Sequence, residues 1–74
     1  MIIPENKNEY NKLKSSERPS GDYMLKSIGC KVNYMYDKIE VIYKQRTYRF
    51  SKVEDNNNLL VDFYYNLIKN ENRI

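Results

Sequence analysis

Residues 31–51 have the sequence KVNYMYDKIEVIYKQRTYRFS, and this stretch decides the fold. Apolar or aromatic residues alternate with polar ones in three short runs, over about 31–36, 39–44 and 47–51. A period of two residues is typical of strands that bury one face. Residues 37–38 separate the first two runs and residues 44–47 separate the last two, which indicates short turns. The stretch therefore predicts a three-stranded antiparallel meander.

The two turns also predict the register of this sheet. A turn at 37–38 pairs Tyr36 with Ile39, and a turn at 44–47 pairs Tyr43 with Tyr48. Both pairings bring the apolar residues to one face, whereas a slip of one residue would divide them between the two faces. The residues expected on this face are Val32, Tyr34, Tyr36, Ile39, Val41, Tyr43, Tyr48 and Phe50. The opposite face is expected to be polar.

Helices are predicted on both sides of the meander. Apolar residues at three- and four-residue spacing predict an amphipathic helix over about 57–69. Upstream, Ser20 as an N-cap and Gly29 just past the end predict a short helix over about 21–28, with a strand as the alternative. Because the last helix can cover the apolar sheet face, we expect residues 20–74 to form a single small α+β domain.

The N-terminal residues 1–19 are polar and contain few apolar anchors. Pro4 suits the first turn of a helix over about 5–14, which Tyr10 and Leu13 would attach to the rest. The alternative is a mobile polar arm. The sequence thus predicts either an arm or a weak helix ahead of the domain.

Length and composition exclude several classes of protein. Seventy-four residues suffice for one small domain. Histidine is absent and cysteine occurs once, which excludes the usual catalytic triads, ordinary zinc sites and an internal disulfide. We therefore predict no enzymatic activity, no catalytic residue, no metal and no cofactor. The single Cys30 is expected to be buried, and the protein is expected to be cytoplasmic. No apolar run is long enough for a membrane helix.

The net charge of +3 is concentrated in the middle of the chain, where residues 23–53 carry seven basic against two acidic side chains. On the polar sheet face, lysine and arginine are expected to form a basic band around an exposed isoleucine, with Lys31 opposite Lys44. A tyrosine expected on the exposed flank of the last helix is a second candidate for contact with a partner. The candidate partner- or anion-binding residues are therefore Lys31, Ile42, Lys44, Arg46, Arg49 and Tyr65.

The favoured function is that of a small non-enzymatic interaction protein. Tyrosine is abundant, and it is enriched in protein interfaces. Small proteins rich in asparagine, lysine, isoleucine and tyrosine are common among phage and mobile-element inhibitors of host machinery, such as anti-CRISPR and other anti-defence proteins. A host protein is therefore the expected partner. Self-association as a homo-oligomer is also expected, because so short a chain builds a marginal core.

Two alternatives remain open. The basic sheet face would suit a nucleic acid or a nucleotide messenger, because cations contact phosphates. The run Tyr48-Arg49-Phe50-Ser51, which precedes a strongly apolar segment, resembles small toxin ribonucleases of the RelE type. That resemblance covers these few residues and implies RNA cleavage by arginine, lysine and tyrosine side chains on a sheet.

Overall fold

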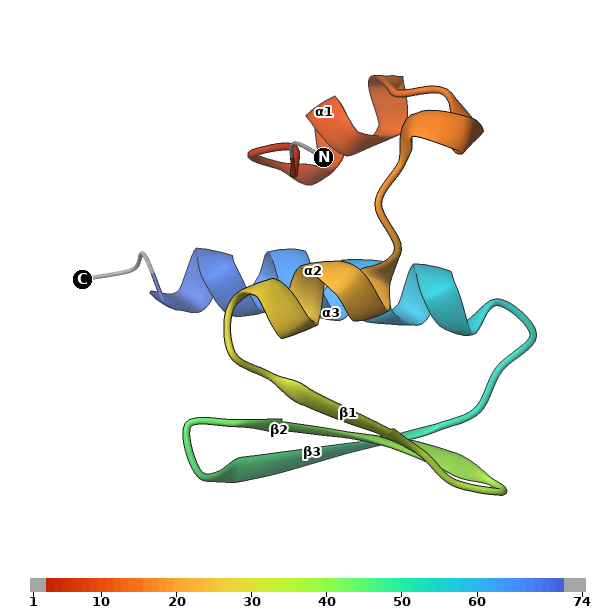
Figure 1. Ribbon diagram of the computed structural model, residues 1–74, viewed down its shortest axis with the longest axis vertical. Helices are drawn as coiled ribbons and strands as arrows, with labels where there is room; N and C mark the ends of the chain where they lie inside the picture. The colour runs from red at the N-terminus through yellow and green to blue at the C-terminus, as the bar shows by residue number, and fades with distance from the viewer. Residues whose placement is uncertain (1–2, 72–74) are drawn as a thin grey trace.

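The computed structural model describes residues 3–71, and their arrangement confirms the predicted α+β class. A three-stranded antiparallel sheet is followed by a C-terminal helix (Figure 1). The elements in chain order are α1 (Lys7–Lys12), the 3-10 turn η1 (Ser15–Glu17), α2 (Gly21–Ser27), β1 (Lys31–Tyr34), β2 (Lys38–Tyr43), β3 (Arg46–Ser51) and α3 (Asn56–Glu71).

The strands follow the order β1-β2-β3, but their register differs from the prediction by two residues in each hairpin. Ile39 pairs with Tyr34 and not with the predicted Tyr36. Tyr43 pairs with Arg46 and not with the predicted Tyr48. A shift by an even number keeps every side chain on its face. The predicted apolar and polar faces therefore survive the error in register.

The turns explain the error. The β2–β3 connection has only two residues, Lys44 and Gln45, whose φ angles of 49° and 68° are those of a type I′ hairpin turn. In the β1–β2 connection, the N–H of Met35 donates to the carbonyl of Lys38 at 2.8 Å, so the turn consists of residues 36–37. The first turn was thus predicted one residue too late, and the second was predicted two residues too long.

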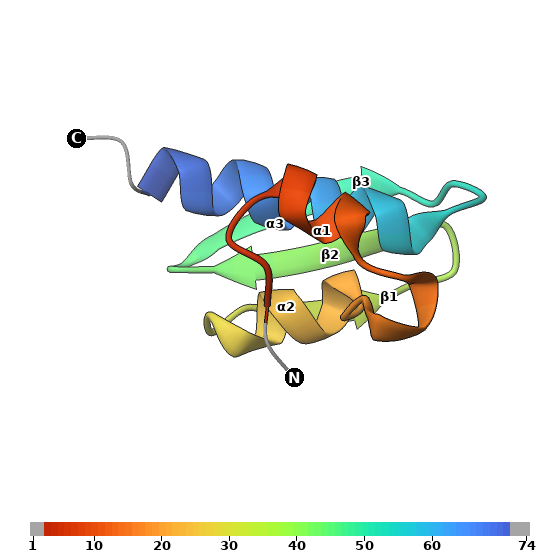
Figure 2. The same cartoon turned by 90° about the horizontal axis from the view of Figure 1, so that it is seen from above.

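Two helices, not one, cover the apolar face of the sheet. Figure 2 shows α2 and α3 side by side on the same side of the strands. They approach closely at Gly21, where an added Cβ would lie 2.5 Å from the Cβ of Leu60. Both helices begin with side-chain caps: Ser20 accepts the N–H of Tyr23, as predicted, and Asp55 accepts the N–H of Asn58.

The core lies between these helices and the sheet. Ile39 and Val41 of β2 are fully buried, as are Met24 and Leu25 of α2. Further along α3, Phe63 packs its ring against Tyr48 and Phe50 of β3, with centroid distances of 5.0 and 4.9 Å. The covered sheet face is therefore aromatic at its β3 side and aliphatic at its centre.

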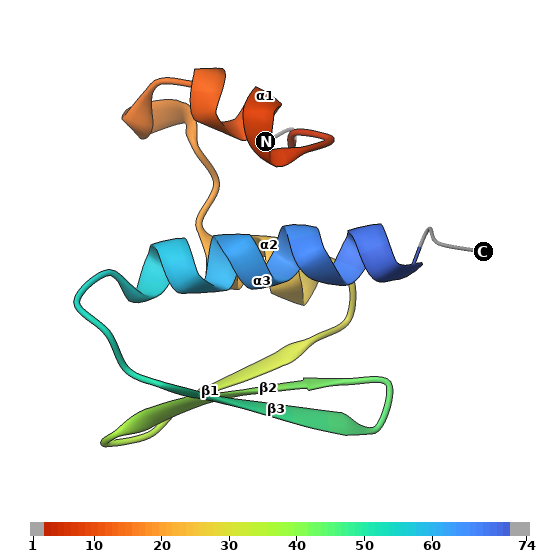
Figure 3. The same cartoon turned by 180° about the vertical axis from the view of Figure 1, so that it is seen from behind.

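The N-terminal segment is a helix rather than an arm over Lys7–Lys12, and it forms a third layer above α2 and α3 (Figures 1 and 3). Tyr10 is buried, and its hydroxyl donates to the carbonyl of Pro19 at 2.9 Å. The Lys7 ammonium forms an ion pair with Asp62 of α3. A few side chains therefore attach α1 to the rest of the molecule. Among residues 3–71, no helix is long and apolar enough to span a membrane.

Candidate functional site

The predicted site residues do not lie together. The uncovered face of the sheet carries Lys31, Ile42 and Arg49. The end of the β2–β3 hairpin carries Lys44 and Arg46, and Arg46 belongs to the covered face because it pairs with Tyr43. The predicted basic band is therefore split between two sides of the sheet.

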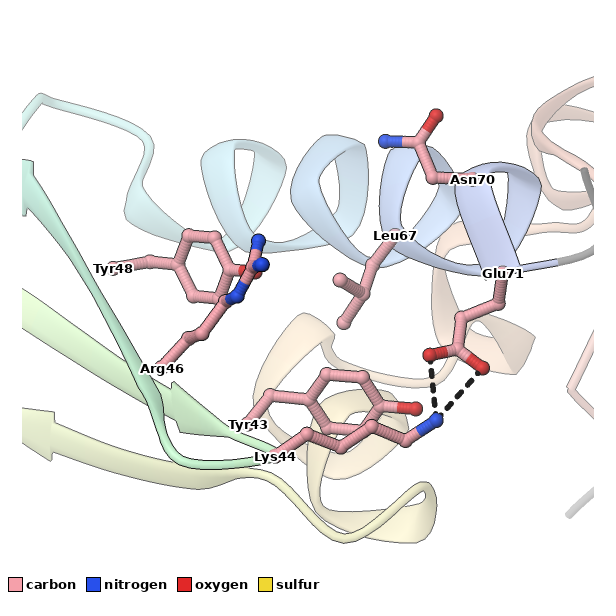
Figure 4. Close-up of a pocket in the computed structure, with 7 residues that line it drawn as sticks. All are labelled: Tyr43, Lys44, Arg46, Tyr48, Leu67, Asn70 and Glu71. Carbon is pink, nitrogen blue, oxygen red and sulfur yellow. Dashed lines mark hydrogen bonds and ion pairs between the residues drawn. The ribbon is translucent and has the colours of Figure 1, made fainter.

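A pocket of about 360 Å³ lies between the β2–β3 hairpin and the last turns of α3 (Figure 4). The hairpin contributes two tyrosine rings and two cations, and α3 contributes a leucine, an amide and a carboxylate. The lining residues are Tyr43, Lys44, Arg46, Tyr48, Leu67, Asn70 and Glu71.

Lys44 at the mouth of this pocket is already neutralised. Its ammonium donates to both carboxylate oxygens of Glu71, at 2.8 and 3.1 Å, and lies 5.2 Å from the centre of the Tyr43 ring. The hydrogen bond to Glu71 raises the pKa of Lys44, and the same bond lowers the pKa of Glu71. Lys44 therefore ties the hairpin to α3 more than it offers a charge to a ligand.

Arg46 differs from Lys44 in its surroundings. Within residues 3–71, no carboxylate lies within ion-pair distance of its guanidinium. Figure 4 shows its side chain extending from the strand toward α3, into the same pocket as Tyr48. A guanidinium presents several N–H donors in one plane, which suits a carboxylate or phosphate. Arg46 is thus the cation of the pocket that can receive an anionic group.

The uncovered face has a charge pattern that differs from the prediction. Arg49 lies opposite Glu40, and its Nε donates to a Glu40 carboxylate oxygen at 2.7 Å. Lys31 lies opposite Ile42, so the predicted juxtaposition with Lys44 is wrong. One of the cations expected to bind a partner is therefore already paired on this face.

The predicted exposure of Tyr65 is wrong. Only 9% of the residue is exposed, because α1 and the segment before it cover this flank of α3. Its hydroxyl donates to the carbonyl of Pro4 at 3.0 Å, and its ring meets the edge of Tyr10 at 6.0 Å. Burial, with smaller contributions from neighbouring tyrosines, raises the pKa of Tyr65 to about 12. In this structure Tyr65 holds the N-terminal segment and does not reach a partner.

Sequence analysis missed the most exposed aromatic residues. Tyr36 is 99% exposed, and its neighbours Tyr34 and Met35 are 54% and 37% exposed. The predicted turn at 37–38 had placed both tyrosines on the covered face. Lys38 is a poor residue for the positive φ of a two-residue hairpin turn. This was the one indication in residues 37–38 that the turn was misplaced.

Two other exposed apolar side chains, Val53 and Tyr23, lie on segments next to this hairpin. The N–H of Lys52 donates to the carbonyl of Asp37 at 3.3 Å, which places the segment containing Val53 beside the hairpin. Tyr34 also lies near the first turn of α2: burial raises its pKa, and the charge of Asp22 in that turn raises it further. We call this surface the tyrosine end, and it consists of Tyr23, Tyr34, Met35, Tyr36 and Val53.

Two side chains that could take part in chemistry are engaged or buried. Glu71 is the carboxylate that lines the pocket, and it is engaged by Lys44. Cys30 is buried, and burial raises the pKa of its thiol, which disfavours the reactive thiolate. The described part of the chain contains no group of three histidine, cysteine or acidic side chains placed to hold a metal ion. No family model, curated protein or solved structure matches the chain, so its function is inferred from its own surfaces.

Proposed function

We propose that this chain is a non-enzymatic interaction protein that binds another protein through its tyrosine end. The observation that carries this proposal is that the β1–β2 hairpin and the segments next to it carry five large apolar side chains, each at least 37% exposed. Exposed apolar groups that adjoin one another are typical of interfaces. Tyrosine is favoured there because its rigid ring supplies contact area at a small cost in conformational entropy.

Tyr36 is the expected anchor of this interface. It follows the end of β1 in the hairpin loop, and at 99% exposure its ring contributes nothing to the core. Burying such a ring against a partner is worth about 2 kcal/mol from apolar area alone. The fold itself does not require an aromatic residue at this position, which supports a role in contact with another molecule.

A finer proposal concerns the identity of the partner. Small size and a composition rich in asparagine, lysine, isoleucine and tyrosine support a phage or mobile-element inhibitor whose partner is a host defence protein. The support for this partner comes from composition, whereas the support for protein binding comes from the tyrosine end.

Binding of a nucleic acid or a nucleotide has less support. Lys44 and Arg49 are paired with Glu71 and Glu40, and Lys31 and Arg46 lie on opposite faces of the sheet. Phosphate binding by several cations requires that they converge on one surface. Within residues 3–71, the feature that favours an anionic ligand is Arg46 in its pocket.

Affinity capture with matched variants tests the proposed function. The wild-type protein, immobilised and exposed to a lysate of its native host, is expected to retain a protein that Tyr36→Ala loses and Tyr36→Phe keeps. Lys12→Ala, a substitution of an exposed residue on α1, serves as the control and should retain the same protein. Equal retention by wild type and Tyr36→Ala would exclude the tyrosine end as the binding surface.

A further inference from the structure

We propose that the outer edge of β3 binds an extended, acidic segment of a partner protein as a fourth strand of the sheet. This inference rests on the proposed function in that it requires a protein partner. It concerns a different surface, the β3 edge, which we define as Arg46–Ser51 and the adjoining Lys52.

The backbone of β3 offers unpaired hydrogen-bonding groups along this edge. The bond from the Lys52 N–H to the Asp37 carbonyl establishes that the even-numbered residues of this strand bond to β2. In an antiparallel ladder the intervening residues direct their N–H and C=O groups to the other side. These are Thr47, Arg49 and Ser51, whose backbone groups therefore point away from the sheet.

The β3 edge is also the more accessible of the two sheet edges. β3 is an edge strand of the sheet, and Figure 2 shows it on the α3 side, with no further strand of residues 3–71 beyond it. The strand has six residues, and Thr47, Arg49 and Ser51 are exposed. The opposite edge belongs to β1, which has four residues and contacts α2. An added strand would therefore find its longer template on β3, about 20 Å in length.

The basic side chains near the β3 edge indicate which kind of segment would bind there. Arg46 projects on the helix side of the sheet, Arg49 on the uncovered side, and Lys52 follows the end of the strand. Of these, Arg49 is paired with Glu40, whereas Arg46 and Lys52 have no carboxylate within ion-pair distance in residues 3–71. Cations near the edge attract a strand that carries carboxylates, because opposite charges on neighbouring strands stabilise pairing.

The same cations argue against a second copy of the chain as the occupant. Basic side chains on an edge strand discourage pairing with another copy, because each copy brings its own cations to the contact. Apolar residues of the ligand opposite Tyr48 and Phe50 would continue the covered layer, where these two rings are only partly buried. Carboxylates on the same side of the ligand, toward its two ends, would lie near Arg46 and Lys52. The expected ligand is therefore an extended segment with apolar residues at its centre and an acidic residue toward each end, which adds to the sheet edge as a strand.

Titration of the labelled protein with a synthetic peptide tests this inference. The probe is a peptide of the length of β3 with valine at its centre and glutamate toward both ends, and its control carries lysine in place of glutamate. Backbone amide exchange followed by NMR is the measurement. We expect the glutamate peptide to slow exchange at Thr47, Arg49 and Ser51, and the lysine peptide to leave these amides unchanged.

Two substitutions separate the backbone and charge contributions. Thr47→Pro removes one outward N–H without removing a ladder bond to β2, so peptide binding is expected to be lost while circular dichroism stays that of the wild type. Thr47→Val keeps the N–H and is expected to bind. Arg46→Gln removes the unpaired cation without touching the backbone, and it is expected to weaken binding where Arg46→Lys does not.

Several outcomes would overturn the inference. They are absence of binding by the glutamate peptide, equal binding of the lysine peptide, protection confined to β1 or to the tyrosine end, and unimpaired binding by Arg46→Gln. If the β3 amides are already protected from exchange with no peptide present, and sedimentation shows a dimer, the edge binds a second copy instead. If Tyr36→Ala still abolishes partner capture while the peptide fails, the proposed function stands and the β3 edge is excluded.

Discussion

At the scale of the residue, the two glycines at the ends of α2 have different tasks. Gly21 is buried where α2 meets α3, and an added Cβ would lie 2.5 Å from the Leu60 Cβ and 2.8 Å from the Val61 nitrogen. Gly29 stands in open space, but its φ of +94° is one that side-chain-bearing residues rarely adopt. Gly21 is therefore required by packing and Gly29 by backbone conformation.

Alanine at these two positions is expected to destabilise the protein for different reasons. Gly21→Ala drives a methyl group into the backbone of α3 and is expected to lower the free energy of unfolding by about 1–3 kcal/mol. Gly29→Ala meets no neighbour and is expected to cost about 1 kcal/mol through its conformation alone. Urea denaturation measures both. A smaller loss at Gly21 than at Gly29 would contradict the close approach of the two helices.

The buried phenol of Tyr65 makes stability dependent on alkaline pH. Burial raises its pKa from the ordinary 10.0 to about 12, so the folded state holds the proton more tightly than the unfolded chain does. The stability associated with the neutral phenol is fully present below the unfolded pKa and is lost as pH rises through the folded value. The expected result is a high-pKa absorbance transition that Tyr65→Phe lacks. Spectrophotometric titration measures it, and an unchanged titration curve in the variant would assign the high pKa elsewhere.

At the scale of the element, the β2–β3 hairpin shows what the sequence can predict. Alternation of apolar residues specified the strands and their buried faces, because a face depends only on odd or even position. It did not specify the register, because a shift of two residues leaves every face unchanged. Register depends on the turn, and Lys44 and Gln45 carry none of the usual signals of a type I′ turn.

The turn residues are therefore a place where the hairpin can be stabilised. Gln45 has a φ of 68°, a conformation that costs a side-chain-bearing residue about 1 kcal/mol and glycine little. Gln45→Gly is expected to raise the melting temperature, whereas Gln45→Ala is expected to give no such gain. Calorimetry distinguishes the two. A lower melting temperature for the glycine variant would contradict the two-residue turn.

At the scale of the whole molecule, charge distribution separates the candidate functions. The sequence located the basic segment but not the carboxylates that oppose it, because Glu71 and Glu40 meet Lys44 and Arg49 only in the folded sheet. The exposure of Tyr36 and the burial of Tyr65 were missed for a similar reason, since the first depends on where the turn begins and the second on where α1 packs. Patterns along the chain therefore predicted the fold better than the surface.

Nucleic-acid binding is expected to be weak and only mildly dependent on salt. Because two of the four predicted cations are paired, this set offers about two phosphate contacts, and a basic site built on it should give a log–log slope of affinity against salt of about 2 or less in magnitude. Fluorescence anisotropy with a labelled oligonucleotide measures this slope. RNA incubated with the protein should remain intact on a gel. A steeper slope would favour the nucleic-acid alternative, and cleavage would favour the ribonuclease alternative.

The attachment of α1 has a consequence for how the molecule opens. Tyr10, Tyr65 and the Lys7–Asp62 pair hold this helix, whereas β2 is hydrogen-bonded on both sides. An element held by so few contacts forms its own unit of local unfolding, with an opening free energy below that of the whole. Native-state hydrogen exchange should therefore release the amides of α1 before those of β2. Each such opening removes Tyr10 from the Tyr65 ring. Tyr65, which is buried in the folded protein, is therefore exposed to solvent in the first partly unfolded form.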